Sequence, residues 1–145
     1  LHAPATISGT MQLLANISID TPDTDVGAEI DAVLPGGRTL VLGQDMMRAR
    51  FRHGVAKADP ATPGAIDPWR FDGFYFTVRQ LPKGTRLRVV LAPLNIPDLQ
   101  KNYNSGGRIG YEKAKDARTA TISVHLDPQH PSWLELPLAP ETGTR

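Results

Sequence analysis

Cysteine is absent from the 145 residues of this chain. Its absence excludes disulfide bonds, thiolate metal sites and cysteine nucleophiles, although it does not fix the cellular compartment. An excess of charge of one sign is also missing. The formal net charge is +1, which is too close to neutral to indicate a nucleic-acid partner. No apolar run approaches the length that crosses a membrane and no signal peptide is recognisable, so we expect no membrane partner.

The chain is rich instead in residues that interrupt helices. Its 13 glycines and 13 prolines recur along most of its length, so few windows suit a helix. The short runs between them alternate with period two, as half-buried strands do. These runs cover residues 11–19, 26–34, 74–78, 85–91, 119–126 and 133–138. The sequence therefore predicts one all-β domain over residues 1–145, a jelly-roll β-sandwich of the galactose-binding-domain-like class with about eight strands.

Several segments do not fit the strand pattern. PGGR at 35–38 and LPKGT at 81–85 have turn chemistry, and YEKAKDAR at 111–118 is the best candidate for a short helix. Residues 53–70 and 95–107 are predicted to be two long irregular loops. Loops of such length are uncommon in compact domains and usually have a function or a partner.

Serine-hydrolase chemistry is not expected within this chain. An α/β-hydrolase carries its nucleophile on a G-x-S-x-G turn between a strand and a helix, and that pentapeptide is absent. Ser105 in NSGG lacks the preceding glycine and the following helix. We therefore predict no catalytic residue in this chain.

Metal sites are also disfavoured. His125 and His130 flank LDPQ, but only Asp127 lies near enough in sequence to add a ligand, so a solvated strand and turn is the favoured interpretation. Asp20 and the two aspartates that follow it in DTPDTD lack the glycine and closing glutamate of a calcium loop. We expect an Asx-type turn there, in which the carboxylates accept local backbone hydrogen bonds, and we predict no cofactor.

Three arginines alternate along RARFR, at positions 48, 50 and 52. A phosphate track is one interpretation of such a stripe. A sheet face on which the arginines lie opposite Glu29 and Asp31 is the other, and the near-neutral net charge favours it.

Aromatic residues make up only 6% of the chain. A sugar-stacking platform could draw on Trp69, Tyr75, Tyr103 and Trp133. Tryptophans are more often partly buried anchors, so a free-standing carbohydrate-binding module is the alternative hypothesis and not the favoured one.

Four segments in order resemble one known family. They are SIDTPDTDVGAEIDAVLPGGR, LVLGQDMMRARFR, LPKGTRLRVVLAPLNIPDLQKNYNSGG and VHLDPQHPSWLELPL. Together they are similar to the C-terminal β-sandwich domain of the X-Pro dipeptidyl-peptidase family, which includes cocaine esterase and the α-amino-acid ester hydrolases. The resemblance covers most of the chain.

The resemblance implies an accessory role. In that family the catalytic Ser, Asp and His lie in an upstream α/β-hydrolase domain, and the β-sandwich packs against it and helps to shape the active-site entrance. We therefore expect a non-catalytic domain excised from a larger hydrolase, with that upstream domain as its partner. Pairing of exposed edge strands makes a homo-oligomer a further hypothesis. The candidate interdomain face comprises Asn95, Asp98, Asn102, Tyr103, Asn104 and Trp69.

Overall fold

The structure is a computed structural model that describes residues 1–94 and 96–140. These residues form nine strands and two 3-10 helices, and none of the helices is long and apolar enough to span a membrane. The all-β prediction is confirmed. The strands are β1 (Ala5–Gly9), β2 (Gln12–Ile19), β3 (Asp25–Val33), β4 (Thr39–Arg48), β5 (Asp67–Phe71), β6 (Thr77–Leu81), β7 (Arg86–Pro93), β8 (Ile122–His125) and β9 (Trp133–Glu135).

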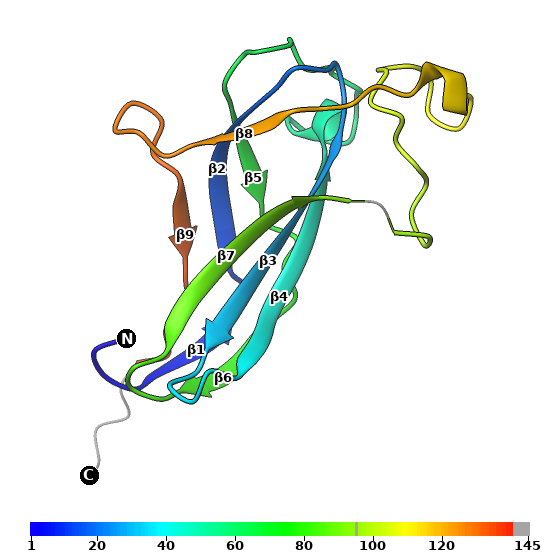
Figure 1. Ribbon diagram of the computed structural model, residues 1–145. Helices are drawn as coiled ribbons and strands as arrows, with labels where there is room; N and C mark the ends of the chain where they lie inside the picture. The colour runs from blue at the N-terminus through cyan, green and yellow to red at the C-terminus, as the bar shows by residue number, and fades with distance from the viewer. Residues whose placement is uncertain (95, 141–145) are drawn as a thin grey trace.

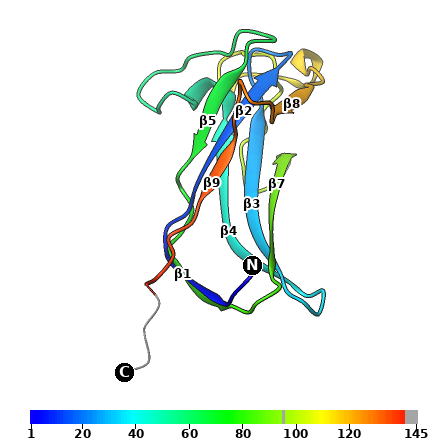
Figure 2. The ribbon, with the colours of Figure 1, turned by 90° about the vertical axis from the view of Figure 1, so that its left-hand side faces the viewer.

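The strands build two facing layers (Figures 1 and 2). One layer has the order β5-β2-β8, and β9 also pairs with β2; the other has the order β4-β3-β7. β1 and β6 form a separate antiparallel ribbon at the lower end in Figure 1. The predicted β-sandwich is therefore confirmed, while its membership of the galactose-binding-domain-like class stays a prediction.

The central strand of each layer supplies the core. Successive side chains of a strand point to opposite faces, and the apolar set of β2 and β3 faces inward as the alternation predicts. None of these side chains is more than 4% exposed. The set is Leu13, Ala15, Ile17 and Ile19 from β2 with Val26, Ala28, Ile30 and Ala32 from β3.

One predicted loop is shorter than expected. Of residues 53–70, those from Asp67 onward belong to β5, which pairs antiparallel with residues 13–17 of β2. The proline content of the segment suggested a loop, but Pro68 lies in an edge strand, where a missing N–H group is tolerated. The alternation of β5 turns Trp69 and Phe71 into the core.

Two further boundaries were wrong. The strand predicted over 74–78 begins only at Thr77, because its partner β1 has five residues and pairs with Thr77–Leu81. The helix predicted over 111–118 is a single 3-10 turn, η2 (Ala114–Asp116). So short a segment cannot stabilise a helix without packing, since helix nucleation is costly.

The two tryptophans provide a test of the core. Trp69 is 1% exposed and Trp133 is 38% exposed. We expect Trp69→Ala to lower the free energy of unfolding by about 3–5 kcal/mol, because it leaves a cavity in the core. Trp133→Ala is the matched control and should cost much less. Urea unfolding followed by circular dichroism measures both, and equal losses would contradict this description of the core.

Candidate interdomain face

The two long irregular segments, residues 53–66 and 96–118, lie at the same end of the sandwich (Figures 1 and 2). We call residues 53–66 the first loop, residues 96–118 the second loop, and the surface that they form together the loop end. The connection between β2 and β3 joins them, because Ala61 N donates to Pro22 O at 2.8 Å and Asn102 donates to Asp23. The positions of both loops therefore depend on a few residues that follow β2.

A buried ion pair lies beneath the loop end. Asp23 is fully buried and Arg50, in the 3-10 helix η1 (Ala49–Phe51), is 5% exposed. Arg50 Nε donates to Asp23 Oδ2 at 2.7 Å, and the Arg50 amide donates to Oδ1 at 2.9 Å. Arg50 Nη1 reaches the carbonyl of Gly107 at 2.8 Å. One arginine thus ties the β4 end of the sandwich to the second loop.

A second pair lies beside the first. Arg48 binds both carboxylate oxygens of Asp25, at 2.7 and 2.8 Å, and donates to the carbonyl of Gln100 at 2.8 Å. The side-chain amide of Asn102 bridges the two pairs, 2.9 Å from Asp23 Oδ2 and 2.9 Å from Asp25 Oδ1. Charge-assisted and bidentate hydrogen bonds are the strong ones in proteins, so this network fixes residues 100–107 with high specificity.

The predicted partners of the arginine stripe were wrong. β4 ends at Arg48, so the three arginines do not share one strand face. Arg52 binds Asp67 at 2.8 Å and lies 3.6 Å from Asp59. Glu29 instead accepts a hydrogen bond from Gln44, and the buried Asp31 accepts two from Arg88. The structure therefore supports pairing of the three arginines with carboxylates and not a phosphate track. Their partners are Asp25, Asp23 and Asp67 in place of Glu29 and Asp31.

The predicted Asx-type turn in DTPDTD was also wrong. Its three carboxylates accept hydrogen bonds from groups distant in sequence, Asp20 from the amide of Thr121 at 2.7 Å and the other two from the network above. No cluster of three or more His, Cys, Asp or Glu side chains within residues 1–94 and 96–140 is arranged to hold a metal ion.

The second loop holds its shape with its own side chains, as its composition predicts. Asn104 has a positive φ of 59°, and its amide donates to Asn102 Oδ1 at 2.9 Å. Asn104 Nδ2 donates to Arg118 O, and Arg118 N donates to Tyr103 O, both at 2.9 Å. Gly106 has φ 77°, and a Cβ there would lie 2.8 Å from Pro22. The loop is therefore a defined structure whose one regular element, among the described residues 96–118, is the 3-10 turn η2.

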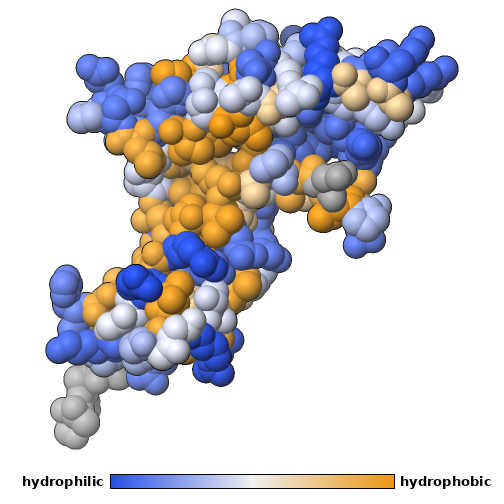
Figure 3. Space-filling model, viewed as in Figure 1, coloured by the Kyte–Doolittle hydropathy of each residue, from blue (hydrophilic) through white to orange (hydrophobic). Residues whose placement is uncertain are grey.

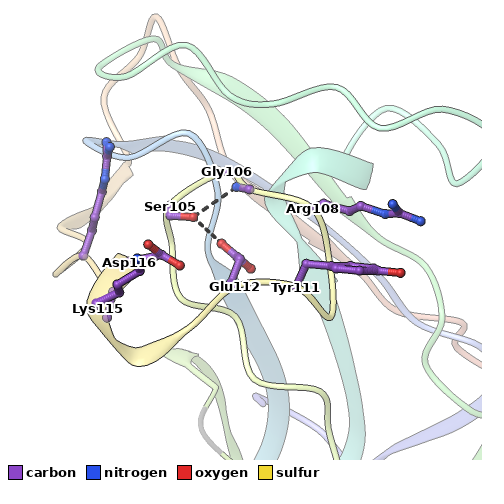
Figure 4. Close-up of a pocket in the computed structure, with 10 residues that line it drawn as sticks. Ser105, Gly106, Arg108, Tyr111, Glu112, Lys115 and Asp116 are labelled. Atoms are coloured by element: carbon purple, nitrogen blue, oxygen red, sulfur yellow. Dashed lines mark hydrogen bonds between the residues drawn. The ribbon is translucent and has the colours of Figure 1, made fainter.

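A polar hollow of about 640 Å³ opens on this loop (Figure 4). Ser105 Oγ donates to a Glu112 carboxylate oxygen and accepts from the amide of Gly107 at 3.1 Å. The guanidinium of Arg108 lies over the ring of Tyr111 at 4.1 Å, a cation–π contact. Ser105 thus closes the loop on itself through the Glu112 carboxylate, and no histidine among the described residues hydrogen-bonds its hydroxyl as in a Ser-His-Asp triad.

One serine–histidine contact was missed in the sequence. Ser18 Oγ lies 2.9 Å from His125 Nε2, on neighbouring strands β2 and β8. Catalysis would require an acceptor that orients the imidazole, and no described residue hydrogen-bonds His125 Nδ1. The contact is a cross-strand hydrogen bond, and only the sheet register could have revealed it.

Comparison with known proteins identifies the family. The sequence pattern of the X-Pro dipeptidyl-peptidase C-terminal non-catalytic domain matches residues 1–135. The chain belongs to this family. The predicted resemblance is thereby confirmed, and the domain type explains why no triad is assembled among the described side chains.

Relatives of this domain are much longer proteins. The chain is 30% identical to cocaine esterase of Rhodococcus sp. (strain MB1 Bresler) over 138 residues, which is 95% of this chain and 24% of that protein. An α-amino acid ester hydrolase has the same fold, with a TM-score of 0.85 at 22% identity over 96% of this chain and 24% of that one. An aminopeptidase from a marine sediment Thaumarchaeota archaeon gives a TM-score of 0.86 at 22% identity, over 94% and 24%. The chain therefore spans about a quarter of their length.

The predicted face residues of this family member fall into three groups. Asn102, Tyr103 and Asn104 are half-buried in the loop end, and Asp98 is exposed on it. Trp69 is in the core on β5, so its side chain offers no surface to a partner. Asn95 lies outside the described residues. Arg48 and Arg50, which position the loop, were not predicted as part of this site.

The aromatic residues do not assemble the predicted sugar platform. Trp69 is buried, while Trp133 lies on β9 with the guanidinium of Arg70 5.7 Å from its ring centre. Tyr103 lies in the second loop, where Lys101 Nζ is 5.3 Å from its ring centre. Trp133 and Tyr103 are thus each next to a cation, and Tyr75 is 52% exposed in the segment between β5 and β6.

The first loop carries a titrating group. A hydrogen bond from His53 holds the pKa of Asp59 below its ordinary value, and the positive charge of Arg52 adds to this effect. Because the folded state lowers this pKa, the contribution of Asp59 to stability is present above the unfolded pKa of about 3.9 and is lost as pH falls through the folded pKa.

The buried ion pair should make the free energy of unfolding sensitive to substitution of Arg50. We expect Arg50→Met to cost about 3–5 kcal/mol, because it leaves the charge of Asp23 buried with one cation fewer. Arg79→Met is the matched control on an exposed arginine and should stay within about 0.5 kcal/mol. Chemical denaturation measures both, and similar midpoints would exclude the ion pair as an important interaction.

The pKa of Asp59 predicts a titration experiment. In His53→Ala the carboxyl of Asp59 should titrate at a higher pH than in the unaltered protein, because its strongest stabilising hydrogen bond is gone. Carbon-detected NMR of the carboxyl groups follows this directly. Asp127, whose pKa is lowered by His130, serves as an internal control and should not move. An unchanged Asp59 midpoint would show that the contact does not persist in solution.

Proposed function

We propose that this chain is the accessory C-terminal domain of a serine hydrolase, whose Ser-His-Asp triad lies in an upstream α/β-hydrolase domain. The parent protein would cleave peptide, ester or amide bonds. Support comes from the non-catalytic family type and from the relatives, which are an esterase, an ester hydrolase and an aminopeptidase. The chain has no hydrolytic activity of its own in this proposal.

The loop end is the surface that we assign to the interface with the catalytic domain. The observation that carries this assignment is the buried network of Asp23, Arg50 and Asn102, which holds residues 100–107, a stretch without helix or strand, in one shape. Burying charges costs free energy, and such a network serves better to specify a shape than to add stability. A fixed loop beside a second domain's active site can help to define its entrance.

The loop end also exposes apolar side chains, whose contact with water is unfavourable. Ile96 is 48% exposed, Tyr111 is 67% exposed, and Val55 in the first loop is 86% exposed. Interfaces between domains of one chain resemble polar protein–protein interfaces with scattered apolar contacts. The mixture of fixed polar loops and single apolar residues fits such a contact.

Amide hydrogen exchange tests the proposed interface. In the isolated chain we expect weak protection at residues 96–101 and 53–58, and stronger protection when the catalytic domain is part of the same protein. The central amides of β3 should be protected equally in both states and serve as the control. Equal protection of the loops in both states would refute the interface. Turnover of an X-Pro anilide or a simple ester by the isolated chain would refute the non-catalytic role.

A further inference from the structure

The sandwich is open along one side, where the last strand of each layer faces the other across a groove. β7 ends the layer β4-β3-β7, and β8 and β9 share the corresponding edge of β2. A groove of about 340 Å³ lies between them, and Figure 3 shows a hollow with apolar surface gathered there. Its lining residues include Leu13, Val89, Leu91, Val124, Leu126 and Trp133.

Side chains that point inward are exposed at this groove. Val89 pairs with Ile30, and Val124 pairs with Ile17, so all four point toward the core. Ile30 and Ile17 are at most 1% exposed, whereas Val89 and Val124 are 41% and 40% exposed. The interior of the sandwich therefore reaches the surface on this side.

Within residues 1–94 and 96–140, no strand pairs with β7 on this side. Leu94 N donates to Asp25 O at 3.2 Å, which places the backbone groups of even-numbered residues toward β3 in this regular ladder. Because hydrogen-bonding direction alternates along a strand, Leu87, Val89 and Leu91 direct their N–H and C=O groups away from β3. These are the residues whose side chains point inward, so the free edge borders the groove.

The first residue of the chain is hydrogen-bonded to the two residues that precede β7. Leu1 N donates to Thr85 O at 2.6 Å, and Gly84 N donates to Leu1 O at 2.9 Å. Thr85 directly precedes β7 and has the same parity as Leu87, Val89 and Leu91. The antiparallel register of β1 and β6, extended back from Ala5 and Leu81, places Leu1 opposite Thr85. A chain that extended this register upstream of Leu1 would run antiparallel to β7 and lie opposite those three residues.

We propose that the residues directly preceding Leu1 in the parent protein form a strand on β7 and close the groove. Side chains of this strand opposite Leu87, Val89 and Leu91 point inward and are apolar, because paired residues share a face. The family comparison is consistent with such a preceding segment. The matched domain is a C-terminal one, and the chain covers 24% of cocaine esterase, so most of that relative lies outside the matched part.

This inference needs only that residues precede Leu1, and it does not depend on where the loop end packs. A second copy of the chain is a less suitable occupant, because Leu1 already pairs with the lower end of the β7 edge. A fourth strand from the same polypeptide extends that pairing and incurs no association cost. It also gives the β4-β3-β7 layer a fourth strand and removes an exposed edge, which is a site of aggregation in β proteins.

The test uses the full-length parent protein and amide hydrogen exchange resolved to single residues. We expect the amides of Leu87, Val89 and Leu91 to be as protected as those of Arg88 and Val90, which bond to β3. Replacing about ten residues before Leu1, the length of a long strand, with a Gly-Ser linker should accelerate exchange at the three odd positions at least about a hundredfold. The even positions should change little.

Three outcomes would overturn the inference. They are fast exchange at the odd positions in the unaltered parent, protection that survives the linker, and protection that depends on protein concentration, which would indicate a second copy. If the loops gain protection from the catalytic domain while the odd amides of β7 do not, this inference fails and the proposed function stands.

A matched pair of substitutions gives a second measurement in the same parent protein. Val89 and Val41 are exposed to a similar degree in this chain, 41% and 47%, but Val41 pairs with Asp31 on the outer face. Under the proposed strand, Val89→Lys buries a charge and should lower the folding equilibrium constant at least about tenfold more than Val41→Lys. Equal effects on the denaturation midpoint would overturn the inference.

Discussion

The arrangement of the loop end depends on the ion pair between Asp23 and Arg50. Both groups are removed from water, so the pair is tolerated only where hydrogen bonds satisfy its remaining atoms. The Arg50 amide, Asn102 and the carbonyl of Gly107 supply most of these bonds, and Arg50 Nη2 is the one buried atom of the pair that has no hydrogen-bond partner among the described residues. The Arg50 amide belongs to the 3-10 helix η1, and Asn102 and the Gly107 carbonyl belong to the second loop. The need to satisfy one buried ion pair therefore helps to position segments that are not held by strand pairing. Together with the Arg48–Asp25 pair, it holds residues 100–107 next to the start of β3.

The strands were predictable where the local pattern alone decides the structure. β2 and β3 alternate without interruption, and a one-residue slip would turn their whole apolar set to solvent, so sequence determines their faces. β5 was not predictable as a strand, because Pro68 signals a loop and the pairing with β2 is a tertiary effect. The same alternation explains Trp69: once DPWRF is a strand beside Ala15, its tryptophan must point inward.

The conformation of the loop at residues 102–107 was predictable from the sequence, but the ion pairs that hold this loop in place were not. The Asn and Gly content of residues 102–107 indicates a self-satisfied turn, and Asn104 and Gly106 adopt the positive φ that such residues allow. The arginine partners depend on register. Asp25 pairs with Arg48 across β3 and β4, and the register shifts between Ile30 and Asp31. In the observed register Glu29 lies opposite Gln44 and Asp31 lies opposite Val41, so the two predicted carboxylates are too far along β3 to meet the arginines.

The loop end and the groove differ in whether their polar and apolar groups are satisfied within this chain. Most polar groups of the loop end are satisfied within the chain, so its shape is complete before any partner binds, and a preformed surface loses little entropy on association. The groove exposes inward-facing valines and one free row of backbone groups, which only a strand can satisfy together. A domain with this division would complete its fold with its own upstream chain and offer its loops to a neighbour. Loss of the strand should then loosen the sandwich, while loss of the Asn102 side chain should loosen the loop end and leave Asp23 with one hydrogen bond fewer.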